Sequence, residues 1–402
     1  MKLKDKESYK VKDNFILMSN KNTRVVVALS GGVDSSVAAY LLVKQGYDVI
    51  GIFMKNWHDE SVTISEECPW LEDSYDAMLV AQKLNIPFKV IDLSSQYKEK
   101  IVDYMFNEYE SGNTPNPDVL CNREIKFDVF LETAKQLNAD FIATGHYARV
   151  LSIDKSKKTY YALKSGIDVE KDQSYFLCQL NQYQLSKTLF PIGNLKKDKV
   201  REIAKKQGLI TAEKKDSQGL CFIGKVKLPD FLQQKLVRKK GNVILISRDN
   251  DMYKKDFGYD DYVYQKEDGK IIGNHIGSHF FTIGQRKGLS IGGMKEPLFI
   301  LATDTINNLI YVGEGSDHPG LYRKSLKVYA DNFHIVNPYY NILNLNKLKA
   351  RIRYRQALQE VSIKADKDCF YFDFTKNQKA IARGQFISIY KSDELIASGV
   401  IH

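Results

Sequence analysis

The feature that most constrains this chain is a short apolar run leading directly into a turn rich in glycine and serine. Residues 25–29 read Val-Val-Val-Ala-Leu, residues 30–36 read Ser-Gly-Gly-Val-Asp-Ser-Ser, and a helical pattern begins near Val37. A buried strand, a glycine turn and a helix start in this order bring backbone N–H groups together, and the helix dipole adds partial positive charge. The segment therefore predicts a cradle for phosphate groups.

The side chains of this turn also favour a nucleotide site. Ser30 and Ser35 offer hydroxyl donors, and Asp34 is placed to cap the helix or to help hold a magnesium ion. The turn is neither a Walker A loop nor a dinucleotide-binding fingerprint, because the spacing of both is absent. The string resembles the PP-loop of ATP pyrophosphatases, enzymes that split ATP into AMP and pyrophosphate. The resemblance implies ATP with Mg²⁺, held by Ala28, Leu29, Ser30, Gly31, Gly32, Val33, Asp34 and Ser35.

Short apolar runs alternate with helical patterns from about Arg24 to Gln207. Strands are expected at 25–29, 49–54, 88–91 and 141–144, and helices at 36–44, 74–84, 97–109 and 125–137. This alternation predicts an α/β fold with a doubly wound parallel sheet, in which ligands bind at the carboxyl ends of the strands. Met54 and Gly145 end two strands, so we expect both at the nucleotide pocket, although core packing alone would also explain Met54. His146 is as suited to packing as to touching substrate.

Beyond about Lys215 the pattern changes to short strands and turns, after one short helical pattern at 228–237. Regular short runs from Pro297 onward predict a small β-barrel. We divide the chain into a disordered extension, a PP-loop catalytic domain, a central domain and a C-terminal β-barrel, at residues 1–20, 21–215, 216–296 and 297–402. No apolar run reaches about 18 residues and no signal peptide is evident, so we expect a cytoplasmic protein with no membrane partner.

Charge and cysteine content narrow the class of function. Lysine and arginine number 59 against 49 acidic residues, a net charge of +10, which suits a polyanionic partner but is equally explained by solubility. The five cysteines are an odd number at wide spacings, which excludes a disulfide framework. Without a C-x-x-C pair or histidines at ligand spacing, we expect no metal site. The thiols are therefore either core residues or reactive ones.

Cys121 has a local context that favours reactivity. It follows the loop Thr-Pro-Asn-Pro-Asp at 114–118, and the helical pattern that begins near Glu124 places it just before a helix N-terminus. That position and the nearby Arg123 both favour the thiolate over the thiol. Asp118 is placed to accept a proton during addition at a carbonyl carbon. A turn with a buried structural cysteine is the alternative.

Cys221 lacks such a context, because residues 216–224 alone read as a strand with a core thiol. The combination with a pyrophosphatase loop changes this interpretation. A pyrophosphatase with two loop-borne cysteines makes chemical sense if one thiol carries sulfur and the other helps to transfer or release it.

Eight segments in the same order along the chain resemble the MnmA/TrmU family of tRNA-uridine 2-sulfurtransferases, also called tRNA-specific 2-thiouridylases. They are residues 30–36, 51–57, 116–126, 145–149, 171–176, 216–224, 282–289 and 353–356. The resemblance implies that Cys121 is the nucleophile and that Cys221 carries a persulfide, with Cys121 either aiding the sulfur transfer or closing a disulfide with Cys221. Departures such as Gln218, where many relatives have Thr, put only loop details in doubt.

The resemblance also implies a set of tRNA contacts. Asn116, Pro117 and Asp118 would lie beside the target base, with Asp118 also in a catalytic role. The other implied tRNA contacts are His146, Lys171, Asp172, Gln173, Arg353, Tyr354 and Gln385. Independently, Arg351, Arg353 and Arg355 alternate in a predicted strand, so we expect three guanidiniums on one face, suited either to phosphate or to solvent.

The predicted reaction is ATP-dependent 2-thiolation of the wobble uridine of tRNA. Adenylation makes the C2 oxygen a good leaving group, and the Cys221 persulfide then delivers sulfur to C2. The resemblance implies a sulfur-relay protein or a cysteine desulfurase as donor. Two alternatives stay open from the residues alone. One is another PP-loop enzyme, such as a 4-thiouridine synthase or a carboxylate-adenylating ligase, and the other is a non-catalytic tRNA-binding protein.

Overall fold

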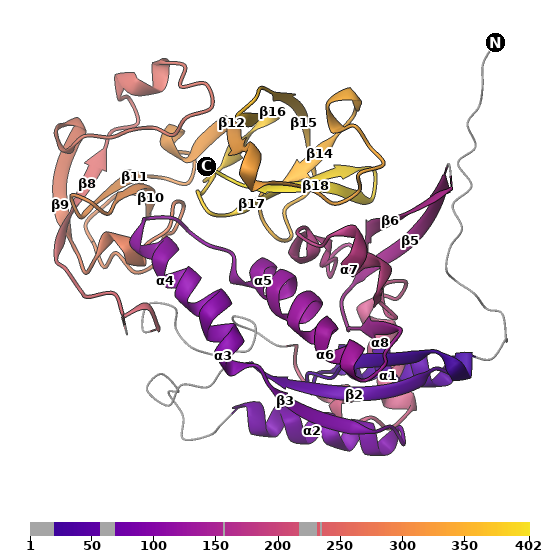
Figure 1. Cartoon of the computed structure of the whole chain (residues 1–402). Coiled ribbons are helices and arrows are strands. Elements are labelled where there is room, and N and C mark those ends of the chain that lie inside the picture. Colours follow the sequence, from indigo (N-terminus) through magenta and orange to yellow (C-terminus); the bar gives the residue numbers. More distant parts are fainter. Residues whose placement is uncertain (1–19, 57–68, 156, 217–230, 234) are drawn as a thin grey trace, which may run out of the picture.

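The first half of the chain folds around a five-stranded parallel sheet, shown in Figure 1 in the computed structural model of the protein. The structure describes residues 20–56, 69–155, 157–216, 231–233 and 235–402. In spatial order the strands are β3 (Phe88–Asp92), β2 (Asp48–Lys55), β1 (Arg24–Ala28), β4 (Phe141–Ala143) and β7 (Thr188–Leu189). The parallel sheet predicted from the alternating pattern is confirmed. The predicted extension over residues 1–19 lies outside the described residues.

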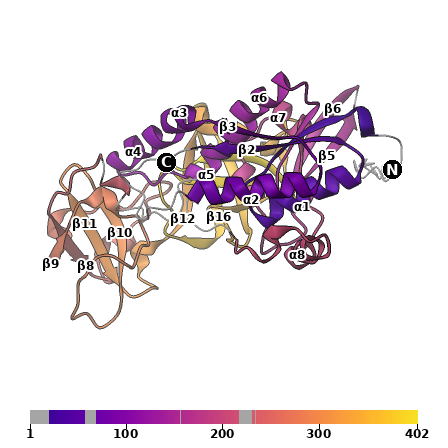
Figure 2. The same ribbon diagram turned by 90° about the horizontal axis from the view of Figure 1, so that it is seen from below.

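Helices cover both faces of this sheet because successive residues of each strand point to opposite sides. Val25 and Val27 of β1 pack with α1 (Val33–Lys44) and α2 (Pro69–Lys83), which Figure 2 shows along one side of the sheet. Val26 and Ala28 face a larger core. That core includes α3 (Ser94–Tyr97), α4 (Asp103–Glu110), α5 (Pro117–Leu120), α6 (Phe130–Gln136), and the π-helical segments Lys98–Val102 and Cys121–Val129. The described residues also include α7 (Gln182–Ser186) and α8 (Lys197–Lys206), and α8 packs against α1.

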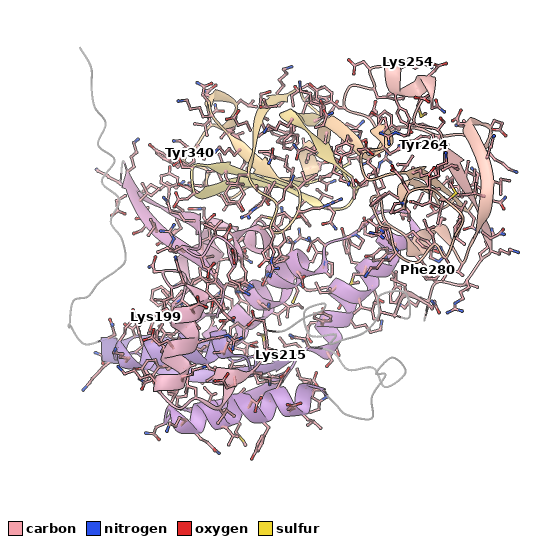
Figure 3. All side chains as sticks on the ribbon, turned by 180° about the vertical axis from the view of Figure 1, so that it is seen from behind. Lys199, Lys215, Lys254, Tyr264, Phe280 and Tyr340 are labelled. Atoms are coloured by element: carbon pink, nitrogen blue, oxygen red, sulfur yellow. The ribbon has the colours of Figure 1, made fainter. Side chains whose placement is uncertain are left out.

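A four-stranded sheet forms the central domain. Its order is β10 (Leu298–Asp304), β11 (Leu309–Glu314), β8 (Gly241–Ile246) and β9 (Gly269–His275). Figure 3 shows this region from behind, with Tyr264 and Phe280 labelled. The predicted boundary at 296/297 is wrong, because β10 and β11 belong to this sheet and not to the C-terminal barrel. β11 pairs in parallel with β8, which lies far earlier in the chain, and strand patterns do not reveal such a distant partner. The helical pattern predicted at 228–237 lies largely outside the described residues.

The C-terminal domain is the predicted barrel-like sheet, and one hairpin of the catalytic domain joins it. The sheet follows the order β12 (Tyr322–Tyr329), β16 (Cys369–Lys379), β15 (Gln359–Ala365), β14 (Lys349–Arg351), β17 (Phe386–Lys391), β18 (Glu394–Val400), β6 (Lys158–Ser165), β5 (Ala148–Lys155), with β13 (Phe333–Ile335) also on β18. Leu163 of β6 pairs with Leu395 of β18. The sheet therefore fixes the C-terminal domain to the catalytic domain.

No helix among the described residues is long and apolar enough to cross a membrane.

Candidate active site

The predicted phosphate cradle lies at the carboxyl end of β1, where α1 begins at Val33. No side chain caps this helix, whose N-cap residue is Gly32. The hydroxyls of Ser35 and Ser36 donate instead to the Gly32 carbonyl oxygen, at 3.1 and 2.8 Å. Gly31 has a φ of +71°, and a Cβ there would lie 2.3 Å from the carbonyl oxygen of Asp73. The turn is thus held by its own serines with its helix N-terminus uncapped, the arrangement that suits an anion.

Gly145 brings the end of β4 against this turn. A Cβ on Gly145 would lie 2.6 Å from the Ser35 nitrogen and 2.7 Å from the Asp34 carbonyl carbon, so only glycine allows this approach. Met54 is 5% exposed and packs in the core beneath α3–α6. Ala28 and Leu29 are also buried. These three residues can therefore offer a nucleotide their main chain and an apolar wall.

Asp34 does not cap α1 but forms a partly buried ion pair with Lys197. The Lys197 ammonium lies 2.8 Å from each Asp34 oxygen, and the Tyr147 hydroxyl donates to Oδ1 at 2.8 Å. Burial and the neighbouring Asp34 raise the pKa of Tyr147, so this hydroxyl keeps its proton. Because Lys197 already neutralises the carboxylate, Asp34 does not fit the role of a magnesium ligand. No cluster of three His, Cys, Asp or Glu within the described residues offers another metal site.

Asp216 joins three basic side chains close to the same turn. Lys197, Lys171 and Arg201 contact its carboxylate at 2.7, 2.8 and 2.9 Å. Burial opposes ionisation, but the hydrogen bonds and charges of Lys171 and Lys197 outweigh it and hold the pKa of Asp216 well below its usual range. Lys197 thereby bridges Asp34 and Asp216. Cys221 itself lies outside the described residues, as does the rest of its segment after Asp216.

The helix that carries Cys121 starts earlier than predicted. It begins at Pro117, with Asn116 as the N-cap, and continues through Leu120 into the π-helical segment that starts at Cys121. The prediction of a helix start near Glu124 is wrong, because Asn116 and Pro117 supply the cap and the first helical residue. Cys121 therefore lies in the second turn and is fully buried. The helix dipole falls off within the first turn, which weakens one of the two reasons given for its thiolate.

Arg123 also differs from its predicted role. Its Nε donates to Glu124 at 2.6 Å, and its Nη1 donates to Gln179 at 3.1 Å. The guanidinium is thus engaged with these two side chains. The prediction that Asp118 handles a proton stays a prediction; this residue is half-buried in the first turn of α5.

The segment 171–173, expected to contact tRNA, is held by internal contacts. Lys171 pairs with Asp216, and Gln173 accepts a hydrogen bond from the Tyr147 amide at 3.0 Å. Asp172 is 5% exposed and forms a buried ion pair with Arg351 of β14. A carboxylate buried in this way is not accessible to an RNA chain. The expected tRNA contact by Asp172 is therefore replaced by a role in holding Arg351 of the C-terminal domain.

The predicted row of three guanidiniums is wrong. β14 ends at Arg351, and Arg355 has a φ of +64°, so the alternation of a strand stops after the first arginine. Arg351 points into the buried pair with Asp172, while Arg353 is exposed and donates to the Ala380 carbonyl. The failure arose because charge alternation alone does not fix where a strand ends.

Two other expected tRNA residues lie beside the Cys121 helix. The Tyr354 ring centroid lies 4.4 Å from that of Phe176, with the two rings tilted by 41°, and the Phe176 carbonyl accepts from Asn122 at 3.1 Å. Gln385 contacts the loop that precedes α5. His146 is buried, with its Nδ1 2.7 Å from the Thr144 hydroxyl, and burial lowers its pKa well below the usual value. His146 therefore stays neutral at physiological pH and packs in this state.

The sequence reasoning missed Lys197. It stands in a lysine-rich stretch that reads as solvated surface, yet its side chain is only 9% exposed. One signal was available, because Lys197 is the first residue of α8, where the helix dipole disfavours a positive charge. A lysine in that position is unfavourable unless an acidic group lies nearby, but the sequence does not show which one.

The parallel sheet with its glycine–serine turn, followed by two β domains, has the fold of a PP-loop ATP pyrophosphatase. Family models agree along the chain: a tRNA methyl transferase HUP domain matches residues 23–225, a tRNA methyl transferase PRC-barrel domain 229–314, and an aminomethyltransferase beta-barrel domain 325–401. These matches follow the same order as the three structural units.

Curated relatives narrow the class to one family. The tRNA-specific 2-thiouridylase MnmA of Christiangramia forsetii is 58% identical over 94% of this chain and 99% of its own length. That of Karelsulcia muelleri is 51% identical over 96% of this chain and 100% of its own. That of Staphylococcus aureus is 42% identical over 96% of each. The chain belongs to the tRNA-specific 2-thiouridylase (MnmA) family, which confirms the resemblance.

Proposed function

We propose that this protein catalyses ATP-dependent 2-thiolation of the wobble uridine of tRNA. The observation that carries the proposal is the 42–58% identity to tRNA-specific 2-thiouridylases over nearly the whole chain. The uncapped glycine–serine turn supports it, because a pyrophosphate-releasing reaction needs a phosphate site at this edge of the sheet. The net charge of +10 adds attraction to a polyanionic substrate.

ATP would lie along residues 28–35, with Gly145 opposite. The amides at the start of α1 and the hydroxyl of Ser30 would receive the phosphates, and the buried main chain of β1 and β2 would flank the base. Lys197 holds Asp34 and Asp216 together beside this turn. Magnesium enters the proposal with ATP, bound to its phosphate oxygens, and no step is routed through a protein-held metal.

The chemistry first makes the uridine C2 oxygen a leaving group. The oxygen attacks the α-phosphate, pyrophosphate departs, and the base becomes adenylated. The outer sulfur of a persulfide on Cys221 then attacks C2, and AMP leaves. Cys121 either assists this transfer or attacks Cys221, which releases the thiolated base and leaves a disulfide between the two cysteines. Asp118 would accept a proton during the addition at C2. A cellular reductant would then reduce the disulfide.

The tRNA would meet the protein where α5 and the C-terminal domain adjoin. Asn116, Pro117 and Asp118 would lie beside the flipped base, and Lys171, Gln173, Arg353 and Tyr354 would border the same region. His146 would contact RNA only after leaving its buried position. Extrusion of the base costs about a few kcal/mol, which the phosphate contacts offset. A sulfur-relay protein or cysteine desulfurase would recharge Cys221, in the cytoplasm where tRNA and ATP occur together.

The two cysteines provide the test of this proposal. Cys121→Ser and Cys221→Ser should each abolish formation of 2-thiouridine, while ATP affinity stays within about two-fold, because neither thiol lies in the phosphate turn. Cys178→Ser is the matched control. Cys178 is fully buried and its pKa is raised to about 11 by burial, so it stays a packed thiol. Full thiolation by the Cys221→Ser protein would refute the assignment of the sulfur carrier.

A further inference from the structure

The C-terminal domain is hydrogen-bonded to the loop at residues 114–116, which precedes the Cys121 helix. The Thr114 amide donates to the Arg383 carbonyl at 2.8 Å. Gly384 approaches so closely that a Cβ there would lie 3.0 Å from the Thr114 carbonyl oxygen. From the central domain, Thr282 contacts the Thr114 hydroxyl at 3.2 Å. All three domains therefore meet at one short loop, where Figure 1 shows β17 close to α5.

Gln385 stands at the centre of this contact, and its side chain is fully engaged. Its Nε2 donates to the carbonyl oxygens of Thr114 and Pro115, at 2.9 and 3.1 Å. Two carbonyl acceptors fix the orientation of the amide, because only its NH₂ end can donate to them. The Oε1 end is consequently turned toward Asn116, whose Nδ2 donates to it at 3.2 Å.

The hydrogen bond from Asn116 to Gln385 also fixes the amide orientation of Asn116, the N-cap residue of α5. Since Asn116 gives its NH₂ group to Gln385, its Oδ1 is left to accept from the Val119 amide at 3.2 Å. That bond is the N-cap of α5, which leads without interruption to Asp118 and Cys121. A side-chain cap of this kind contributes about 1 kcal/mol to its helix.

We propose that Gln385 is a positioning residue for the Cys121 loop, through which the C-terminal domain sets the geometry of the thiol. This inference rests on the proposed function and deepens it. Gln385 acts through Asn116 and the main chain of Thr114–Pro115. The C-terminal domain is thereby a structural part of the active site as well as an RNA-binding surface.

The test compares variants of the full-length protein in two assays. Gln385→Met keeps the length of the side chain and removes all three hydrogen bonds. Gln385→Glu keeps an acceptor for Asn116 but turns a carboxylate toward two carbonyl oxygens. Gln359→Met is the matched control, because Gln359 lies in the same domain on β15 and its side chain donates to Ala357 nearby.

The first assay needs neither ATP nor tRNA. Alkylation of Cys121 by iodoacetamide is followed by mass spectrometry of its peptide. Since Cys121 is fully buried, it reacts only when the loop opens. Loss of the Gln385 hydrogen bonds should raise the alkylation rate of Cys121 about ten-fold in Gln385→Met and Gln385→Glu, because these bonds hold the loop closed. Gln359→Met should react at the wild-type rate.

The second assay separates positioning from RNA contact. In Gln385→Met, kcat at saturating tRNA should fall about ten-fold while the Kd for tRNA changes less than about two-fold. An unchanged Cys121 alkylation rate, or a raised tRNA Kd with kcat retained, would overturn the proposal. Should Gln385→Met not fold, Asn116→Asp keeps the cap acceptor and loses the donor to Gln385, and it must show the same alkylation increase. A wild-type protein that fails to thiolate tRNA would refute the proposed function and leave the alkylation comparison valid.

Discussion

The buried pair between Asp172 and Arg351 gives a prediction whose size follows from the structure. Each side chain is 6% exposed, and the pair joins the catalytic domain to β14 of the C-terminal domain. Asp172 also accepts from the Gly166 amide at 3.0 Å and the Ser174 amide at 3.1 Å. Asp172→Asn preserves the shape and the acceptor for these amides but removes the charge that compensates Arg351.

Removing one partner of a buried ion pair costs about 3–5 kcal/mol, because the other charge stays buried. Arg351 would keep the Tyr390 hydroxyl, 3.0 Å from its Nε, so we expect the lower end, about 3 kcal/mol. With a urea slope of about 3 kcal/mol/M, the unfolding midpoint should fall by about 1 M. Circular dichroism measures this shift, and hydrogen exchange should place the lost protection in β14 and β17.

Two comparisons make this prediction refutable. Asp172→Asn combined with Arg351→Met removes both charges, keeps the acceptor for the two amides, and should recover most of the loss. Asp251→Asn breaks an exposed pair with Lys254 and should leave the midpoint unchanged. A midpoint for Asp172→Asn within about 0.2 M of wild type would show that the pair does not hold the two domains together.

Two further predictions concern the nucleotide turn and pH. Gly145→Ala should weaken ATP binding at least about ten-fold by calorimetry, because its Cβ would meet the backbone of Asp34 and Ser35; unchanged affinity would place ATP elsewhere. Burial lowers the pKa values of His146, His275 and His334, so below about pH 6.5 the unfolded chain binds more protons than the folded protein. The contribution of these histidines to the free energy of unfolding should be fully present above that pH and should fall as the pH drops toward 5.5. Equal urea midpoints at pH 7.5 and 5.5 would contradict this.

Local features of this chain were predictable and long-range ones were not. The strand, the glycine turn and the helix start at residues 25–36 follow from periodicity and glycine placement, and the structure has them within a few residues of the prediction. Lys197 and Asp34 meet across 163 positions, and Asn116 and Gln385 across 269. No local pattern encodes such partners, because the residue type alone does not distinguish a buried lysine from an exposed one.

The wrong expectations have two origins, one distant in the chain and one local. β14 ends at Arg351, whose side chain pairs with Asp172, a partner that belongs to another domain. The start of the Cys121 helix was missed because the pattern was read from apolar spacing, whereas Asn116 and Pro117 are its actual start signals. Caps and buried pairs thus decided where the sequence reasoning failed.

The central claim is that this protein places sulfur on C2 of the wobble uridine. The most direct measurement incubates the protein with unmodified tRNA, ATP and a persulfide donor, and identifies the nucleosides by mass spectrometry. The account predicts 2-thiouridine at the wobble position, formed only with ATP and accompanied by AMP and pyrophosphate. Formation of 4-thiouridine instead, or release of pyrophosphate without any thiolated nucleoside, would contradict it.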